Sequence, residues 1–316
     1  MDLRELGERA AIRRMVAHFP TRLNALAFGD DCAAVPLGDQ YLLLTTDAVA
    51  EPTHFPRGAT PYERGWFAAA VNLSDIAAKG GEPLGLLLAM GLPPTLDAAF
   101  LDDLARGAAD CAAQAGAEIL GGDTKQNPTL TITGTAIGLV PKGELLRRAG
   151  AKAGDLIAVT GPLGGAGADY FARLAGTVSP GGRLLHPTPR VREGRALAKG
   201  GAHASLDLSD GLALGLYDMA EAAGLGFEVE AGKVPLHPQA TADPQGAAWA
   251  FHFGGDYELL AAVPPDRWDV IAAAVRAAGG QLHAIGRFTP PGAHHLVAAD
   301  GSKQVLPRRG WEHFRS

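Results

Sequence analysis

Short apolar runs alternate along the chain with longer segments in which apolar residues recur at helical spacing. This alternation predicts a protein that contains both strands and helices. Strands are expected at 41–47, 84–90, 117–120, 129–140, 155–161, 205–208, 226–230, 257–263 and 282–287. Helices are expected at 3–18, 61–79, 96–116, 164–175, 189–200, 210–223 and 265–279. Residues 231–250 contain three prolines and are expected to be rich in loops.

A polar, basic segment at 141–155 interrupts this pattern, and a second series of strands and helices follows it. The chain has 316 residues, which is more than one hydrophobic core usually organises. We therefore expect two domains of mixed α+β or α/β class, at 1–140 and 150–316.

Composition narrows the class of protein. The net charge is -6 and no basic stripe is present, so a nucleic-acid partner is not expected. No apolar stretch reaches the length of a membrane span, and the first residues lack the apolar core of a signal peptide. These features predict a cytoplasmic protein without a membrane partner. Two free thiols are therefore favoured for Cys32 and Cys111, with one disulfide as the alternative.

Aspartates recur in short settings rich in Gly, Ser or Thr. The settings are GDD (29–31), TTD (45–47), NLSD (72–75), GGDT (121–124) and DLSDG (207–211). A single Asp at such a place is usually a turn or cap residue, and Asp31 is interpreted in this way. Asp75 is different because it interrupts an apolar helix, where an unpaired charge is costly. Several carboxylates can converge only around cations, and ligands that are all oxygens favour Mg²⁺.

Magnesium held by carboxylates is typical of sites that transfer phosphoryl groups. The chain has no GxxxxGK[ST] and no GxGxxG motif, so a P-loop, a Rossmann site and a protein-kinase glycine loop are not supported. An enzyme that uses ATP without these motifs must hold the phosphates through metal ions and backbone amides.

Eight segments, taken in order, resemble the thiamine-monophosphate kinase family of the aminoimidazole-ribonucleotide-synthetase-like ATP-binding superfamily. They are ELGE (5–8), GDDCA (29–33), LLLTTDAVAEPTHF (42–55), VNLSDIAAKGGEP (71–83), LGGDT (120–124), LDLSDGL (206–212), GGDYELL (254–260) and GWEHF (310–314). The resemblance implies phosphorylation of thiamine monophosphate by ATP to give thiamine diphosphate. It also implies a homodimer in which paired N-terminal domains form a β-barrel-like core, each subunit adding a C-terminal α/β domain.

The resemblance also assigns site residues. It implies as Mg²⁺ ligands Asp30, Thr45, Thr46, Asp47, Asp75, Asp123, Asp207 and Asp210. It implies as ATP contacts Gly121, Gly122, Arg148 and Ser209, and as contacts to the thiamine phosphate His54 and Trp311. The family usually reads GGEDYEL where this chain reads GGDYELL, so either Asp256 or Glu258 carries the acidic role beside the substrate, or the loop is rebuilt.

No catalytic base is expected, because a phosphate monoester is already ionised near neutral pH. Catalysis would be electrostatic, with several metal ions between two polyanions and direct in-line transfer. Two alternatives stay open. One is another ATP-using enzyme of the superfamily, such as an aminoimidazole-ribonucleotide synthetase. The other is a non-catalytic binder of thiamine phosphates or nucleotides.

Overall fold

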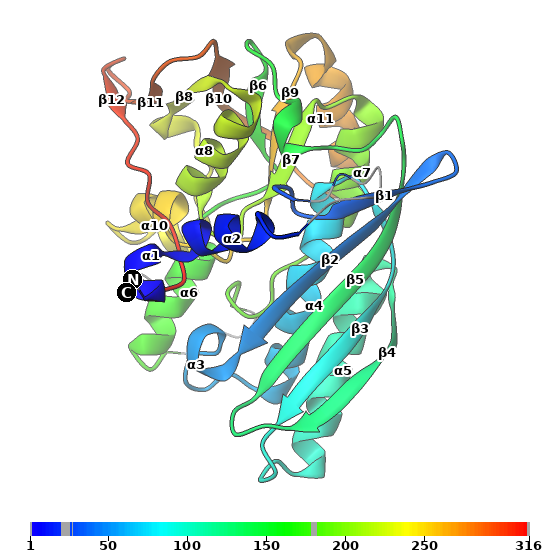
Figure 1. Cartoon of the computed structure of the whole chain (residues 1–316). Helices are drawn as coiled ribbons and strands as arrows, with labels where there is room; N and C mark the ends of the chain where they lie inside the picture. The colour runs from blue at the N-terminus through cyan, green and yellow to red at the C-terminus, as the bar shows by residue number, and fades with distance from the viewer. Residues whose placement is uncertain (1, 20–25, 27, 178–181, 315–316) are drawn as a thin grey trace.

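Two sheets with flanking helices organise the chain, for which the computed structural model describes residues 2–19, 26, 28–177 and 182–314 (Figure 1). The strands are β1 (Ala33–Leu37), β2 (Gln40–Ala50), β3 (Glu82–Leu92), β4 (Glu118–Gln126), β5 (Thr131–Pro141), β6 (Leu156–Val159), β7 (Ala204–Asp207), β8 (Gly226–Glu230), β9 (Leu259–Val263), β10 (His283–Thr289), β11 (His294–Val297) and β12 (Lys303–Val305). The α-helices are α1 (Leu3–Leu6), α2 (Glu8–Val16), α3 (Glu51–His54), α4 (Pro61–Ala78), α5 (Ala98–Ala115), α6 (Gly165–Leu174), α7 (Val191–Gly200), α8 (Leu212–Ala223), α9 (Pro238–Thr241), α10 (Gly246–His252) and α11 (Trp268–Ala277). This is a two-domain α+β fold with mixed sheets.

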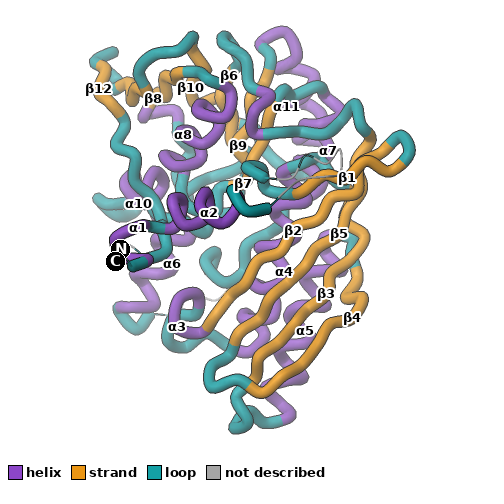
Figure 2. Tube along the Cα trace, viewed as in Figure 1, coloured by secondary structure: helices purple, strands orange, loops and turns teal. Residues whose placement is uncertain are grey.

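The first sheet has the strand order β1-β2-β5-β3-β4, in which only β3 and β4 pair in parallel. Helices α4 and α5 pack on one face of this sheet, as the purple helices behind the orange strands show (Figure 2). Burial alternates along β5, as expected for a strand with one face toward a core. Within the described residues the sheet stays open, with β1 and β4 at its edges.

Helices α4 and α5 approach each other closely because glycine stands at two contact points. A Cβ atom added to Gly65 would lie 1.9 Å from the carbonyl oxygen of Leu104. A Cβ atom added to Gly107 would lie 2.0 Å from the carbonyl oxygen of Tyr62. Helix α4 begins at Pro61, after a capping box in which Thr60 and Glu63 bond reciprocally.

The second sheet has the order β12-β11-β8-β10-β6-β9-β7. Only β11 and β8 pair in parallel, so the sheet is mixed rather than the parallel sheet typical of an α/β domain. No helix in the part of the chain that the structure describes is both long and apolar enough to cross a membrane.

The two halves meet along α4. This helix contacts α7 and the edge strand β7 of the second sheet as well as its own sheet. A Cβ atom added to Gly194 would lie 2.0 Å from the carbonyl oxygen of Ala77, so α7 lies directly against the end of α4. Side chains near the end of α4 therefore face residues of the second sheet.

Three sequence expectations differ from the structure. The helix expected at 3–18 is two helices, because Gly7 adopts a φ of 75° between them. The region 231–250, expected to be rich in loops, contains α9 and the beginning of α10. Its prolines are compatible with these helices because proline is tolerated at or before the first residue of a helix. The strand expected at 117–120 continues to Gln126, so the GGDT segment lies inside β4 instead of after a strand.

Candidate functional site

Three carboxylates converge where the two halves meet. One oxygen from each of Asp31, Asp75 and Asp207 can be chosen so that all lie within 4.8 Å of one another. Asp31 lies in the loop before β1, Asp75 lies inside α4, and Asp207 ends β7. We call these residues the acidic cluster. Asp75 and Asp207 were expected here, whereas Asp31 had been interpreted as a turn residue.

Neighbouring hydroxyl groups hold two of these carboxylates in place. The Thr45 hydroxyl donates to Asp75 Oδ2 at 2.5 Å, and the Ser74 hydroxyl donates to Asp207 Oδ2 at 2.7 Å. The backbone N–H of Asp47 donates to Asn72 Oδ1 at 3.0 Å, which ties β2 to α4 beside the cluster. Strand β2 and helix α4 therefore fix the positions of Asp75 and Asp47 together.

Thr46 points to the other face of β2. Its hydroxyl donates to the carbonyl oxygen of Gly134 at 2.8 Å and accepts from the Thr135 hydroxyl at 3.2 Å. Successive strand residues face opposite sides, so Thr45 and Thr46 do not face the same group. Of the two threonines, the structure brings Thr45 to the acidic cluster.

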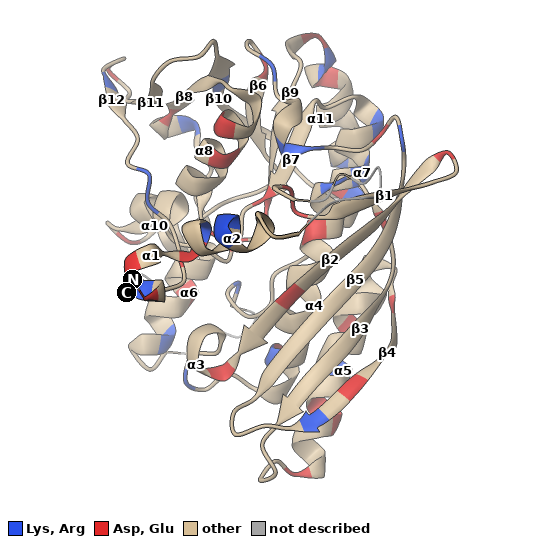
Figure 3. Ribbon diagram, in the orientation of Figure 1, with Lys and Arg blue, Asp and Glu red and all other residues tan. Residues whose placement is uncertain are grey.

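Two cations neutralise the loop that contains Asp30 and Asp31. Figure 3 shows acidic and basic stretches of the ribbon close together around β7 and the neighbouring end of α4. Lys79 Nζ lies 2.5 Å from Asp30 Oδ1 and 2.6 Å from Asp31 Oδ2. Arg148 donates through Nε to Asp31 Oδ1 at 2.9 Å and through its backbone N–H to Asp30 Oδ2 at 3.1 Å. The side chain expected to contact ATP is thus engaged with Asp31 in this structure.

The electrostatics separate the cluster into a neutralised part and a repelling part. Burial acts to raise the pKa of Asp31, but Lys79 and Arg148 outweigh it and lower that pKa. Burial and the charges of nearby carboxylates raise the pKa of Asp75 well above its usual value. Burial and the charge of Asp31 raise the pKa of Asp207 to about 7. Among the described residues, neither Asp75 nor Asp207 forms a salt bridge, although the charge of Arg148 acts to lower the pKa of Asp207.

Asp47 lies at the solvent-facing rim of this group. Burial of its carboxyl group and the charge of Asp31 raise its pKa, although a hydrogen bond to Asp75 opposes the shift. A hard divalent cation fits this arrangement because every donor is an oxygen and several carboxylates repel one another. Asp31 Oδ2 is buried and lies 2.6 Å from Lys79 Nζ, so the charge of Asp31 is already compensated on this side of the cluster.

The GGDT segment lies elsewhere on the described molecule. Asp123 is 61% exposed in its side chain and pairs with Lys125 Nζ at 2.9 Å. It stands in β4, the edge strand of the first sheet, beside Gly121 and Gly122. Gly122 is required there, because an added Cβ atom would lie 1.8 Å from the carbonyl oxygen of Leu88. Within the described chain, these residues do not join the acidic cluster.

The loop after β7 places Ser209 and Asp210 near the C-terminal segment. The backbone N–H of Trp311 donates to the carbonyl oxygen of Asp210 at 3.1 Å, and that of Gly255 donates to the carbonyl oxygen of Ser209 at 2.8 Å. Burial and the charge of Glu8 raise the pKa of Asp210 to about 6. The structure thus holds Asp210 between the first helices and the C-terminal segment.

Aromatic residues from distant parts of the sequence meet near His54. Its ring centroid lies 5.6 Å from that of His313, which in turn lies 5.9 Å from that of Trp311. Burial and the nearby His313 lower the pKa of His54. The Trp311 residue is 50% exposed, so one part of its indole stays available for a ligand. The two residues expected to contact the thiamine phosphate are therefore near neighbours.

Asp256 and Glu258 both bind groups of their own chain. Asp256 accepts from the backbone N–H groups of Gly164 at 2.6 Å and Ala166 at 3.0 Å, at the beginning of α6. Glu258 is fully buried and accepts from Arg183 at 2.6 Å and from Arg190 at 2.5 Å. Both carboxylates stabilise the loops around them, and the acidic role that the resemblance gives one of them stays a prediction.

Sequence reasoning missed two residues of the site, Asp31 and Lys79. Lys79 directly follows an apolar helix, and a charge beside apolar residues is the kind of sequence signal that identified Asp75. In the structure Lys79 is 1% exposed.

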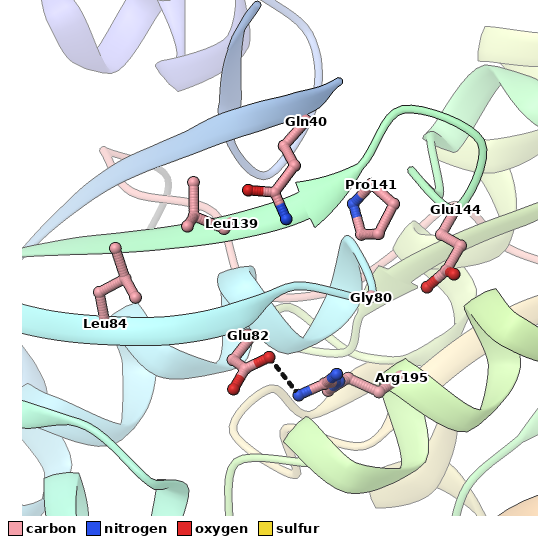
Figure 4. Close-up of a pocket in the computed structure, with 8 residues that line it drawn as sticks. All are labelled: Gln40, Gly80, Glu82, Leu84, Leu139, Pro141, Glu144 and Arg195. Atoms are coloured by element: carbon pink, nitrogen blue, oxygen red, sulfur yellow. Dashed lines mark ion pairs between the residues drawn. The ribbon is translucent and has the colours of Figure 1, made fainter. Parts of the chain in front are cut away.

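A cavity of about 160 Å³ lies at the junction of β3, β5 and α7, where Arg195 pairs with Glu82 at 2.6 Å (Figure 4). None of the residues that line it belongs to the acidic cluster.

Comparison with known proteins agrees with this architecture. Residues 29–140 match the AIR synthase related protein, N-terminal domain, and residues 152–298 match the AIR synthase related protein, C-terminal domain. The chain therefore has the two-domain organisation of AIR synthase related proteins.

Individual relatives show to which family of AIR synthase related proteins this chain belongs. The chain is 38% identical over 284 residues to the thiamine-monophosphate kinase of Methanospirillum hungatei, covering 90% of this chain and 92% of the relative. It is 38% identical over 296 residues to that of Halobacterium salinarum, covering 90% and 94%. The solved structure of AaThiL complexed with AMPPCP and TMP gives a TM-score of 0.86 at 29% identity and covers 99% of both chains. The chain belongs to the thiamine-monophosphate kinase family, as the sequence motifs indicated.

Proposed function

We propose that this protein transfers a phosphoryl group from ATP to thiamine monophosphate, giving ADP and thiamine diphosphate. The observation that carries the proposal is the acidic cluster of Asp31, Asp75 and Asp207 in a chain of this family. The related structure that contains AMPPCP and TMP supports the pairing of an adenine nucleotide with that phosphate ester. ATP is accordingly a co-substrate.

We propose Mg²⁺ as the cation of the acidic cluster. Asp31, Asp75 and Asp207 would hold it, with Asp47 at the rim, and Thr45 and Ser74 orient two of these carboxylates. Bound Mg²⁺ would lower the repulsion between two phosphate groups and stabilise charge on the one being transferred. Asp123 and Asp210 stay candidate ligands by resemblance alone.

The residues of this chain supply no general base in our proposal, and none is needed. The acceptor is a phosphate monoester, whose second ionisation lies near pH 6. Its oxygen can attack directly and in line. The roles left to the protein are orientation and charge: Arg148 is a candidate phosphate contact once it leaves Asp31, and Trp311 offers a ring face to the cationic thiazolium.

We also propose that the protein is a homodimer assembled through the first sheet, at the 1–140 domain. The face opposite α4 and α5 carries exposed apolar side chains, namely Leu84, Leu87 and Leu120. A contiguous apolar face on a sheet is typical of an interface. Replacement of Leu120 by aspartate should convert the dimer into a monomer in sedimentation experiments. A native chain that sediments as a monomer would contradict the proposal.

A cytoplasmic location agrees with the two cysteines, Cys32 and Cys111, which are buried free thiols. The domain limits 1–140 and 150–316 also stay our proposal, since the two sheets and the two family matches follow the same division.

The direct test measures ADP released from ATP with Mg²⁺ and a panel of acceptors. Release that requires thiamine monophosphate, together with formation of thiamine diphosphate, is expected. Release with aminoimidazole precursors instead would assign the chain to another reaction of the superfamily. Binding of both ligands without ADP release would show a non-catalytic binder.

A further inference from the structure

Lys79 is a charged side chain in an unusual place. It follows the last residue of α4 and is 1% exposed, one of the largest fully buried side chains in the described chain. A buried ammonium group is strongly unfavourable unless nearby oxygens compensate its charge. The surroundings of Lys79 must therefore supply that compensation.

Three oxygens surround its ammonium group. Asp30 Oδ1 lies at 2.5 Å, Asp31 Oδ2 lies at 2.6 Å, and the carbonyl oxygen of Ser205 accepts a hydrogen bond at 2.8 Å. The two carboxylates come from the loop before β1, and the carbonyl group comes from β7 in the second sheet. Two carboxylates and one carbonyl group are also the donors that a hard divalent cation takes in proteins.

This oxygen set adjoins the acidic cluster, because Asp31 belongs to both. Asp31 Oδ2 contacts Lys79, while Asp75 and Asp207 accept hydrogen bonds from the hydroxyl groups of Thr45 and Ser74 and form no salt bridge within the described residues. Asp30 is occupied on both oxygens, by Lys79 and by the backbone N–H of Arg148. A protein-borne cation thus stands on one side of the cluster, and the uncompensated carboxylates stand on the other.

We propose that the ammonium group of Lys79 occupies one cation position of the acidic region and takes the place of a divalent ion there. The inference rests on the proposed function only in that the cluster binds Mg²⁺. Lys79 is a positioning residue in this role. It keeps Asp30 from acting as a metal ligand, while Asp75 and Asp207, with Asp31 beside them, bind the divalent ion.

The test counts divalent ions by using Mn²⁺ as the probe, on the full chain without nucleotide, by electron paramagnetic resonance. Lys79→Met removes the charge at similar length, and it should bind one Mn²⁺ per chain more than the native protein. Lys79→Arg keeps the charge and should retain the native count. The double variant with Lys79→Met and Asp30→Asn removes a ligand of the vacated position and should return to the native count.

Lys79→Met can lose stability without metal, so a second variant keeps the proposal testable. Asp30→Asn in the native background should bind as many Mn²⁺ ions as the native chain, because Lys79 already occupies that position. A lower count in Asp30→Asn, or a native count in folded Lys79→Met, would overturn the proposal. The proposed function fails separately, if the native chain binds no Mn²⁺ or releases no ADP with thiamine monophosphate.

Discussion

Replacement of Asp75 by asparagine tests the acidic cluster most directly, since it removes one charge and keeps the shape of the side chain. One oxygen each of Asp31, Asp75 and Asp207 lie within 4.8 Å of one another. At an effective dielectric constant of about 20, two unit charges at that separation repel by about 3 kcal/mol. Burial and the neighbouring carboxylates raise the pKa of Asp75, which reduces the relief of repulsion that asparagine can bring.

The variant should therefore be as stable as the native protein, or more stable by about 1–3 kcal/mol, when metal is absent. Mg²⁺ should reverse this order of stability, so that the native protein becomes the more stable of the two. A ligand at about 100 times its dissociation constant adds about 2.7 kcal/mol to the free energy of unfolding of the native protein, and the variant should gain less. Turnover should fall by about 10²-fold or more, as expected when one electrostatic contact to a transferring group is lost.

Two measurements check this reasoning: thermal unfolding with EDTA and with Mg²⁺, and ADP release from ATP and thiamine monophosphate. Asp103→Asn is the matched control, because Asp103 is 44% exposed and pairs with exposed Arg106 at 2.7 Å. It should change neither stability nor turnover. Native-like activity of Asp75→Asn, or a variant less stable than the native chain in EDTA, would refute the metal assignment.

Three further substitutions test other parts of the structure. Gly122→Ala should destabilise the protein by about 2 kcal/mol or more in urea, because the new Cβ atom would meet the carbonyl oxygen of Leu88 at 1.8 Å; Gly143→Ala, with no atom within 4 Å, is its control and should be neutral. Asp256→Ala should cost about 2 kcal/mol of stability, since two backbone N–H groups at the start of α6 lose their acceptor; an unchanged urea midpoint would contradict that role. Trp311→Ala should raise the KM for thiamine monophosphate about 10-fold with little change in the KM for ATP, if its exposed ring stacks on the thiazolium; equal effects on both constants would exclude a specific contact.

The sequence predicted the cluster better than it predicted the partners of each carboxylate. Asp75 was identifiable because a charge inside an apolar helix must be compensated. The same argument applies to Lys79, but the compensating residues, Asp30 and Ser205, lie 49 and 126 positions away in the chain. Local patterns cannot show such pairs, because only the packing of α4 against β7 and against the loop before β1 brings them together.

The GGDT segment shows a different limit of sequence reasoning. Two glycines after an apolar run are typical of a turn, yet here they continue β4. Both have positive φ values, 151° and 159°, which residues with a side chain rarely adopt, and both pair with β3, at Leu87 and Leu88. Glycine is present at position 122 because the neighbouring strand leaves no room for a Cβ atom, and the sequence does not reveal that neighbour.

The shared helix α4 has a thermodynamic consequence for the whole chain. Its residues bond across the junction of the two halves, from Ser74 to Asp207 at 2.7 Å and from Lys79 to the carbonyl oxygen of Ser205 at 2.8 Å. Neither half can swing away from the other without exposing a buried ammonium group and a buried carboxylate. The two halves should therefore melt as one cooperative unit in calorimetry, and fragments cut between them should be unable to fold separately.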